Sequence, residues 1–200
     1  MKKHIFELVI IFVLASVLSL GAFANDTQKS ISEKMVRLHV IANSDSESDQ
    51  AVKLKVRDAI LEEVANLTED CKDIADVQKR ISDNLPRLTT VAENTLSENG
   101  FNYGAEAELA KTFFPSKYYD GFALPAGEYN ALRIKLGEAS GKNWWCVLFP
   151  PLCISAAEEP AEIQLSESGL SDDEIKLVTS DEIEYKYKFK IVEFFQNLFR

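Results

Sequence analysis

The sequence predicts an α+β fold: a β-α-α-β-β-β core with two helices packed on one face of a mainly antiparallel sheet, followed by an acidic linker and a C-terminal amphipathic helix. Three observations predict it. A strand pattern leads through a polar turn into a helix pattern between Arg37 and Asp58, a second long helix pattern follows, and the other strand patterns come after the helices. Strands and helices are therefore segregated along the chain, which is typical of α+β folds.

The first strand and the first helix are joined by small polar residues. Residues 36–41 alternate as in a strand, and Asn43, Ser44, Asp45 and Ser46 end it, because such side chains bond to nearby backbone N–H groups. Ser46 followed by Asp49 resembles a capping box with Asp in place of Glu or Gln, so a helix should begin there. Its apolar side chains have helical spacing: Val52, Val56, Ala59, Ile60 and Leu67.

The second helix pattern runs from about Asp73 to Glu98, and Pro86 interrupts it. Proline removes a helix hydrogen bond and clashes with the preceding turn, so we expect a kink or a break near Leu85. Asn99 and Gly100 supply the usual stop signal.

Three strands should follow, because the apolar period changes to two. It does so in residues 105–109, 132–136 and 145–149. Gly137 to Asn143 reads as a hairpin loop between the last two strands, and Pro115 to Gly127 as a longer aromatic loop.

The N-terminal residues 1–24 have the pattern of a secretory signal peptide. Lys2 and Lys3 precede an apolar run, and Ala22 to Ala24 forms an A-x-A site, so cleavage is expected after Ala24. The apolar run, Leu8 to Leu20, is shorter than the roughly 20 residues that span a bilayer. An uncleaved signal anchor is the alternative. We expect residues 25–33 to be an N-terminal linker and residues 34–154 to form the domain.

Residues 155–182 are acidic and poor in aromatics, which predicts a mobile linker. Residues 183–200 form an amphipathic tail, whose helical face carries Phe194, Phe195, Leu198 and Phe199. This helix could dock on its own domain, which we expect first, or contact a membrane surface or a partner helix.

Charge excludes some classes of partner. Removing residues 1–24 takes away Lys2, Lys3 and Glu7, which changes the net charge from −10 to −11. A polyanion repels nucleic acid, and no basic patch with interleaved aromatics is present, so nucleic-acid binding is disfavoured.

Two cysteines are candidates for a disulfide. Cys146 and Cys153 flank Pro150 and Pro151, which would reverse the chain, and export would permit a bridge. Two buried free thiols are the alternative. Cys71 would remain unpaired.

His39 is the only histidine left after residue 24, so it is the only histidine base available to a cysteine nucleophile. A secreted Cys/His hydrolase is therefore an alternative function, although a packed strand residue is the commoner explanation. No catalytic residues are assigned.

No metal or cofactor site is predicted. Asp45, Glu47 and Asp49 lack the glycine and the distant Glu of an EF-hand loop, and they suit the positive end of a helix better. Gly137 to Asn143 lacks the spacing and the Ser or Thr of a phosphate loop.

Trp144 and Trp145 are adjacent on a strand, so they should face opposite sides of the sheet. One of them could be an exposed anchor for a protein partner, or both could be buried, one of them beneath the Pro115 to Gly127 loop. The candidate partner-binding residues are thus His39, Asn43, Ser44, Asp45, Asp49, Trp144 and Trp145.

Two stretches carry a family resemblance: RLHVIANSDSESDQAVKLKVRD, from Arg37 to Asp58, and LPAGEYNALRIKLGEASGKNWWCVLFPPLC, from Leu124 to Cys153. With them, the chain resembles the stage II sporulation protein R family over Lys34 to Ile154, plus the signal segment. The resemblance implies a signalling protein made in the forespore and exported into the space between the forespore and mother-cell membranes. There it would trigger a membrane-embedded aspartic peptidase that matures pro-sigma-E. An envelope-structural protein is a third possibility beside the hydrolase.

Overall fold

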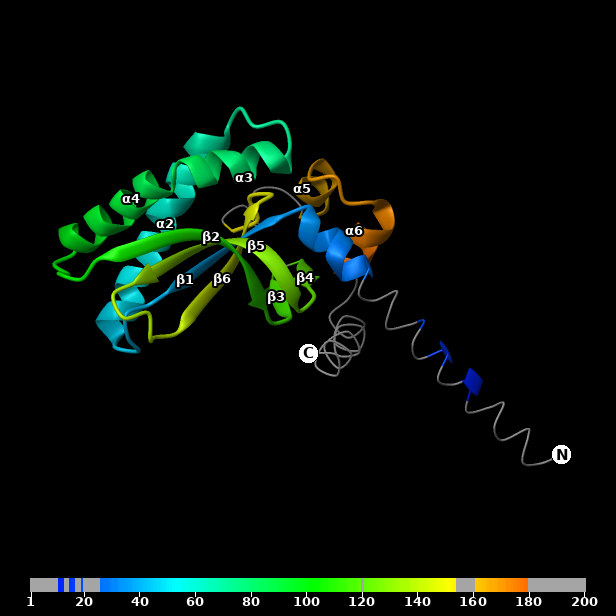
Figure 1. Ribbon diagram of the computed structural model, residues 1–200, viewed down its shortest axis with the longest axis horizontal. Helices are drawn as coiled ribbons and strands as arrows, with labels where there is room; N and C mark the ends of the chain where they lie inside the picture. Colours follow the sequence, from blue (N-terminus) through cyan, green and yellow to red (C-terminus); the bar gives the residue numbers. More distant parts are fainter. Residues whose placement is uncertain are drawn as a thin grey trace.

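The computed structural model describes residues 11–12, 15–16, 19, 26–119, 121–153 and 161–179 (Figure 1). The expected cleavage point at Ala24 and the predicted tail with Phe194, Phe195, Leu198 and Phe199 lie outside these residues. Among the described residues, no helix has the length and apolarity needed to cross a membrane.

The main sheet has four strands in the order β2-β5-β1-β6. They are β1 (Val36–Ile41), β2 (Ala105–Phe114), β5 (Gly127–Leu136) and β6 (Asn143–Phe149). β1 runs parallel to β5 and antiparallel to β6, and β2 runs antiparallel to β5. The sheet is therefore mixed and mainly antiparallel, which confirms the predicted α+β class.

The prediction of a hairpin between the last two strands is wrong, because β1 lies between β5 and β6 and pairs with both. Every residue of β1 is buried, and a strand buried on both faces belongs at the centre of a sheet. The loop of residues 137–142 consequently crosses the end of β1 instead of closing a hairpin.

Three helices cover one face of this sheet: α2 (Glu47–Thr68), α3 (Ile74–Asp83) and α4 (Leu85–Glu98) (Figure 1). The long second helix of the prediction is split at Asn84, with Pro86 in the first turn of α4, where its missing N–H removes no helix hydrogen bond. The break expected near Leu85 is thus confirmed. The core between helices and sheet combines side chains of β1 with the apolar faces of α2 and α4: Val36, Leu38, Val40, Val56, Ile60, Leu88, Ala92 and Leu96.

A second cluster covers only one end of the opposite sheet face. It contains the short hairpin of β3 (Lys117–Tyr119) and β4 (Phe122–Leu124), helical residues 26–33, and the helices α5 (Ala161–Glu167) and α6 (Asp172–Thr179). The predicted aromatic loop therefore contains a two-stranded sheet. Apolar side chains from both flanking segments close this cluster, among them Ile31, Met35, Leu165, Leu170 and Val178.

The prediction of linkers is wrong over residues 26–33 and 161–179. Glu174 of α6 is buried and accepts hydrogen bonds from Ser30 Oγ and Lys34 Nζ, each at 2.6 Å. Burial alone would raise the pKa of Glu174, but the bonds from Lys34, Ser30 and Ser171 outweigh it and lower the pKa to about 2. The two segments that flank the predicted domain therefore dock onto each other and onto the domain.

Candidate functional site

The turn of residues 43–49, the loop of residues 137–142 and Tyr103 form one cluster, which we call the polar corner. The Asn43 carbonyl accepts bonds from the Ser140 N–H (3.2 Å) and the Ser140 hydroxyl (2.6 Å), and Asn43 Oδ1 accepts from the Glu138 N–H (3.0 Å). Asp45 Oδ1 accepts from the Lys142 N–H at 2.7 Å. The two stretches that carry the family resemblance are thereby joined at one end of the sheet.

Asp49 is the central acceptor of the polar corner. Its carboxylate accepts from the Ser44 hydroxyl (2.5 Å), the Tyr103 hydroxyl (2.6 Å) and Asn43 Nδ2 (2.9 Å), and its backbone N–H donates to Ser46 Oγ, the N-cap of α2. The predicted cap is therefore confirmed. Donors from Ser44, Tyr103 and Asn43 stabilise the charged form, which lowers the pKa of Asp49 to about 2.

A buried lysine links α2 to the loop of the polar corner. Lys53 of α2 donates to Gln50 Oε1 (2.6 Å) and to the Lys142 carbonyl (3.0 Å), and its burial lowers the pKa of its ammonium. Most polar atoms of Asn43, Ser44 and Asp49 are thus engaged inside the protein. The part of the turn that faces solvent is Asp45, Ser46, Glu47 and Ser48.

The sheet face away from α2, α3 and α4 carries two rows of side chains across all four strands. Register pairing gives the first row as Glu108, Arg133, His39 and Trp145, and the second as Glu106, Lys135, Ile41 and Asn143. We call these eight residues the striped face. They lie between the polar corner and the hairpin of β3 and β4.

His39 and Trp145 form the floor of the striped face. The imidazole stacks on the indole with ring centroids 3.8 Å apart, and His39 Nε2 lies 2.8 Å from Asn143 Oδ1, to which the Nε2–H tautomer donates. Burial is the main reason that the pKa of His39 falls to about 4. The ring is therefore neutral at neutral pH.

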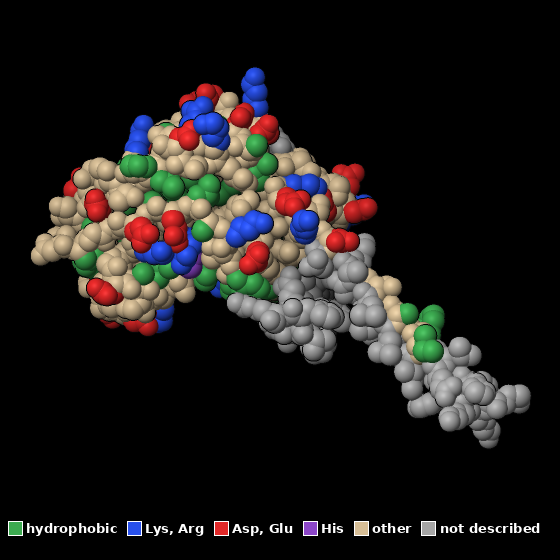
Figure 2. All heavy atoms as spheres, viewed as in Figure 1, with side chains coloured by type: hydrophobic (Ala, Val, Ile, Leu, Met, Phe, Trp, Pro, Cys, Tyr) green, Lys and Arg blue, Asp and Glu red, His purple; other side chains and the backbone are tan. Residues whose placement is uncertain are grey.

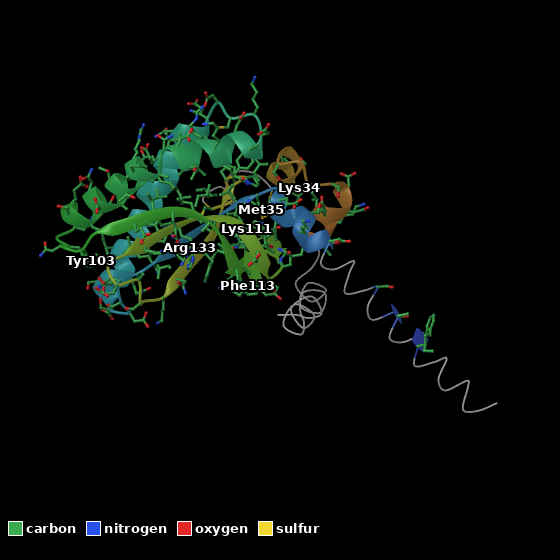
Figure 3. All side chains as sticks on the ribbon, in the orientation of Figure 1. Lys34, Met35, Tyr103, Lys111, Phe113 and Arg133 are labelled. Carbon is green, nitrogen blue, oxygen red and sulfur yellow. A yellow bond between two sulfur atoms is a disulfide. The ribbon has the colours of Figure 1, made fainter. Side chains whose placement is uncertain are left out.

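Four charges lie beside this floor in two stripes. Arg133 Nη1 is 2.5 Å from Glu108 Oε1, and Lys135 Nζ is 3.0 Å from Glu108 Oε1 and 3.5 Å from Glu106 Oε2. Of these four residues, the two acids belong to β2 and the two bases belong to β5. Figure 2 shows acidic and basic side chains gathered beside a histidine, and Figure 3 marks Arg133 within the sheet, between Tyr103 and the end that carries Lys34.

The tryptophans face opposite sides of the sheet, and neither is fully exposed. Trp144 packs with the helix-side core, where the Arg57 guanidinium lies 4.3 Å from its ring centroid. Trp145 packs against His39 and Phe114, and the Tyr119 hydroxyl of β3 donates to its carbonyl at 3.4 Å. Trp144 is therefore a helix-side residue, and Trp145 alone contributes to the striped face.

Arg37 lies beside His39 on the same strand and is completely buried. Its Nε donates to the Cys146 carbonyl (2.8 Å), its Nη2 donates to the Tyr119 hydroxyl (2.6 Å), and its guanidinium lies 4.2 Å from the Phe114 ring centroid. These contacts hold the hairpin of β3 and β4 against the sheet and set the boundary of the striped face.

The cysteines do not form a dyad with His39. Cys146 and Cys153 are joined in a disulfide. Cys71 is free, but it packs against the helix-side core, whereas His39 stacks on Trp145 on the other sheet face, and burial raises the pKa of the Cys71 thiol. Within residues 26–119, 121–153 and 161–179, no cysteine is therefore placed for His39 to activate.

No group of three or more His, Cys, Asp or Glu side chains in the described part of the chain is arranged to hold a metal ion. The residues that sequence reasoning missed are Tyr103 and the charges at 106, 108, 133 and 135. The alternation of the four charged residues with apolar residues was visible within each strand, but the pairing of β2 with β5 was not.

The comparisons with known proteins agree with the resemblance found in the sequence. The family model described as stage II sporulation protein R matches residues 32–159. The stage II sporulation protein R of Bacillus subtilis (strain 168) is 39% identical over 160 residues, which cover 76% of this chain and 71% of that protein. No solved structure matches. The chain belongs to the stage II sporulation protein R family.

Proposed function

We propose that this chain is an exported signalling protein of endospore formation that activates the membrane-embedded aspartic peptidase responsible for processing pro-sigma-E. The observation that carries the proposal is the family match, which covers the whole sheet and helices α2 to α4. The signal-peptide pattern of residues 1–24 supports export into the space between the forespore and mother-cell membranes.

In this proposal the protein acts by binding and does not itself break a bond. A ligand shifts a two-state peptidase only if it binds the active conformation more tightly than the inactive one. A tenfold preference would correspond to about 1.4 kcal/mol of differential binding free energy. The separation of His39 from the cysteines of the described residues favours this role over a Cys/His hydrolase.

The test is a reconstitution. Residues 25–200, the peptidase in lipid vesicles and the pro-sigma substrate are mixed, and conversion of the substrate is followed by gel electrophoresis. We expect conversion only when all three are present. A peptidase variant without its catalytic aspartates is the control, and it should abolish conversion.

Conversion of the substrate by residues 25–200 together with that inactive peptidase would show a proteolytic activity of this chain. Equal conversion with and without this chain would remove the signalling role. Either result overturns the proposal.

A further inference from the structure

On the striped face, the acidic and the basic side chains lie on two separate, adjacent strands. Glu106 and Glu108 project from β2, Arg133 and Lys135 project from the adjacent β5, and the two stripes run side by side. Glu106 keeps 65% of its side-chain surface in solvent, and the other three side chains are partly exposed: 31% for Glu108, 27% for Arg133 and 25% for Lys135. The two stripes cancel in net charge but form a fixed pattern of opposite signs.

Two buried polar atoms beneath this face have no hydrogen-bond partner among the described residues. His39 Nδ1 and Arg133 Nε are buried atoms without a hydrogen-bond partner, and the two residues are directly paired in the sheet register. Buried polar atoms in native proteins are nearly always paired. In the Nε2–H tautomer, Nδ1 is an acceptor and Arg133 Nε–H is a donor, but both atoms are buried, so the groups that a partner can reach are the exposed charges of the two stripes.

The surroundings of the face differ from those of the rest of the sheet. The helices α2, α3 and α4 cover the opposite face, and the hairpin, residues 26–33 and α6 cover only the other end of this one. The two rows thus lie on the end of this face that these described elements leave uncovered, where the charged side chains lie beside the stacked rings of His39 and Trp145.

We propose that the striped face is the surface through which this protein contacts its peptidase partner, and that the partner presents a basic stripe opposite β2 and an acidic stripe opposite β5. This inference rests on the proposed function, because the partner is the peptidase named there. A polypeptide is the fitting occupant, since it can place both signs of charge about one strand spacing apart. A nucleic acid or an anionic membrane offers a single sign, which the acidic stripe repels.

The experiment separates recognition of the charge pattern from its structural role. Glu106→Lys changes the most exposed of the four charges. A second variant, E106K/E108K/R133E/K135E, reverses both stripes and so keeps every ion pair between β2 and β5 with its polarity inverted. The matched control is Lys79→Asp with Asp83→Lys, which reverses an exposed ion pair on α3.

Residues 25–200 of each variant are titrated against peptidase vesicles, with empty vesicles as the blank. Binding of the labelled chain and conversion of pro-sigma are both measured, and the thermal unfolding midpoint is measured for each variant. We expect Glu106→Lys and the fourfold reversal to raise the half-maximal concentration at least tenfold. The α3 control should keep the unfolding midpoint of the unchanged chain, and Glu106→Lys should lower it only slightly, because the lysine faces Lys135 from a largely exposed position.

Normal binding by the fourfold reversal would show that the charges only stabilise the pairing of β2 with β5 and do not recognise the partner. This result would overturn the inference. Normal binding by Glu106→Lys would also overturn it, including in the event that the fourfold variant fails to fold. In both cases the unchanged chain still activates the peptidase, so the proposed function stands. Failure of the unchanged chain to bind or activate would overturn both.

Discussion

The Tyr103 hydroxyl donates a hydrogen bond of 2.6 Å to the Asp49 carboxylate, which connects the segment before β2 to the first turn of α2. Burial and the neighbouring Asp49 carboxylate raise the pKa of Tyr103, so the hydroxyl keeps its proton and remains a donor at neutral pH. Sequence positions 54 residues apart are thereby fixed at one end of the sheet.

The Asp49 carboxylate should make stability depend on pH. Its pKa is about 2 in the folded chain, below the ordinary value of 3.8. As the pH falls, the carboxylate is therefore protonated in the unfolded chain at a higher pH than in the folded chain. The stabilisation is fully present above pH 4 and is lost as the pH falls through 2. We expect Asp49→Asn to lower the unfolding free energy at pH 7 by roughly 1 to 3 kcal/mol, since three donors then face an amide.

Urea denaturation at several pH values measures this effect. The difference in unfolding free energy between the two chains should shrink as the pH falls from 4 to 2. A difference that stays constant over this range would contradict the assignment.

Gly141 should tolerate no side chain, because a Cβ there would overlap the Ser44 carbonyl oxygen. We expect Gly141→Ala to lower the unfolding free energy by roughly 2 to 3 kcal/mol, as in an overpacked site. Gly100→Ala is the control: Gly100 has a φ of +82°, but no atom lies within 4 Å of the position that its Cβ would take, so only the backbone term of about 1 kcal/mol applies. Thermal unfolding of both variants compares them, and equal losses would argue against contact between the loop and the turn.

Glu174→Gln should loosen the docking of residues 26–33 on α6. The amide keeps the shape but loses the charge that faces Lys34 at 2.6 Å, and we expect a loss of roughly 1 to 3 kcal/mol. Hydrogen exchange should become faster in residues 26–33 and 172–179, and remain unchanged in α2. Asp173→Asn, an exposed change on the same helix, is the control. Unchanged exchange in Glu174→Gln would contradict the docking.

The folded chain should carry one thiol that can be alkylated. Cys146 and Cys153 are bridged, and burial raises the pKa of Cys71, so labelling at pH 7 should reach one site and proceed several-fold more slowly than for free cysteine. Mass spectrometry without reductant counts the labels. Cys71→Ser should abolish labelling, whereas two additional labels on the native chain would show that the bridge does not form.

Local sequence patterns were sufficient for the elements that ordinary helix and turn chemistry determines. The cap at Ser46 and the break before Pro86 depend on neighbouring residues alone, and both were predicted. The disulfide candidates were also visible, because the two cysteines flank a proline turn.

The order of the strands could not be predicted in the same way. A loop of the length and glycine content of residues 137–142 can close a hairpin or cross over one intervening strand, and only the burial of β1 on both faces decides between them. The striped face depends on that order, so its charges at 106, 108, 133 and 135 remained four separate surface residues in the sequence.

The acidic composition of residues 155–182 concealed a short helix signal. Ser171 and Glu174 have the S-x-x-E spacing of a capping box, and the structure shows Ser171 Oγ accepting from the Glu174 N–H at 3.3 Å. Leu165, Leu170 and Val178 are too widely spaced to stand out among the acids, yet they bury against Ile31 and Met35.

The most direct test of the signalling role is the rate of pro-sigma conversion by vesicles that hold the peptidase, measured as residues 25–200 are titrated in. We predict a saturating increase that needs the catalytic aspartates of the peptidase and is weakened by Glu106→Lys. A rate that does not respond to this chain, or conversion that persists with an inactive peptidase, would contradict the signalling role.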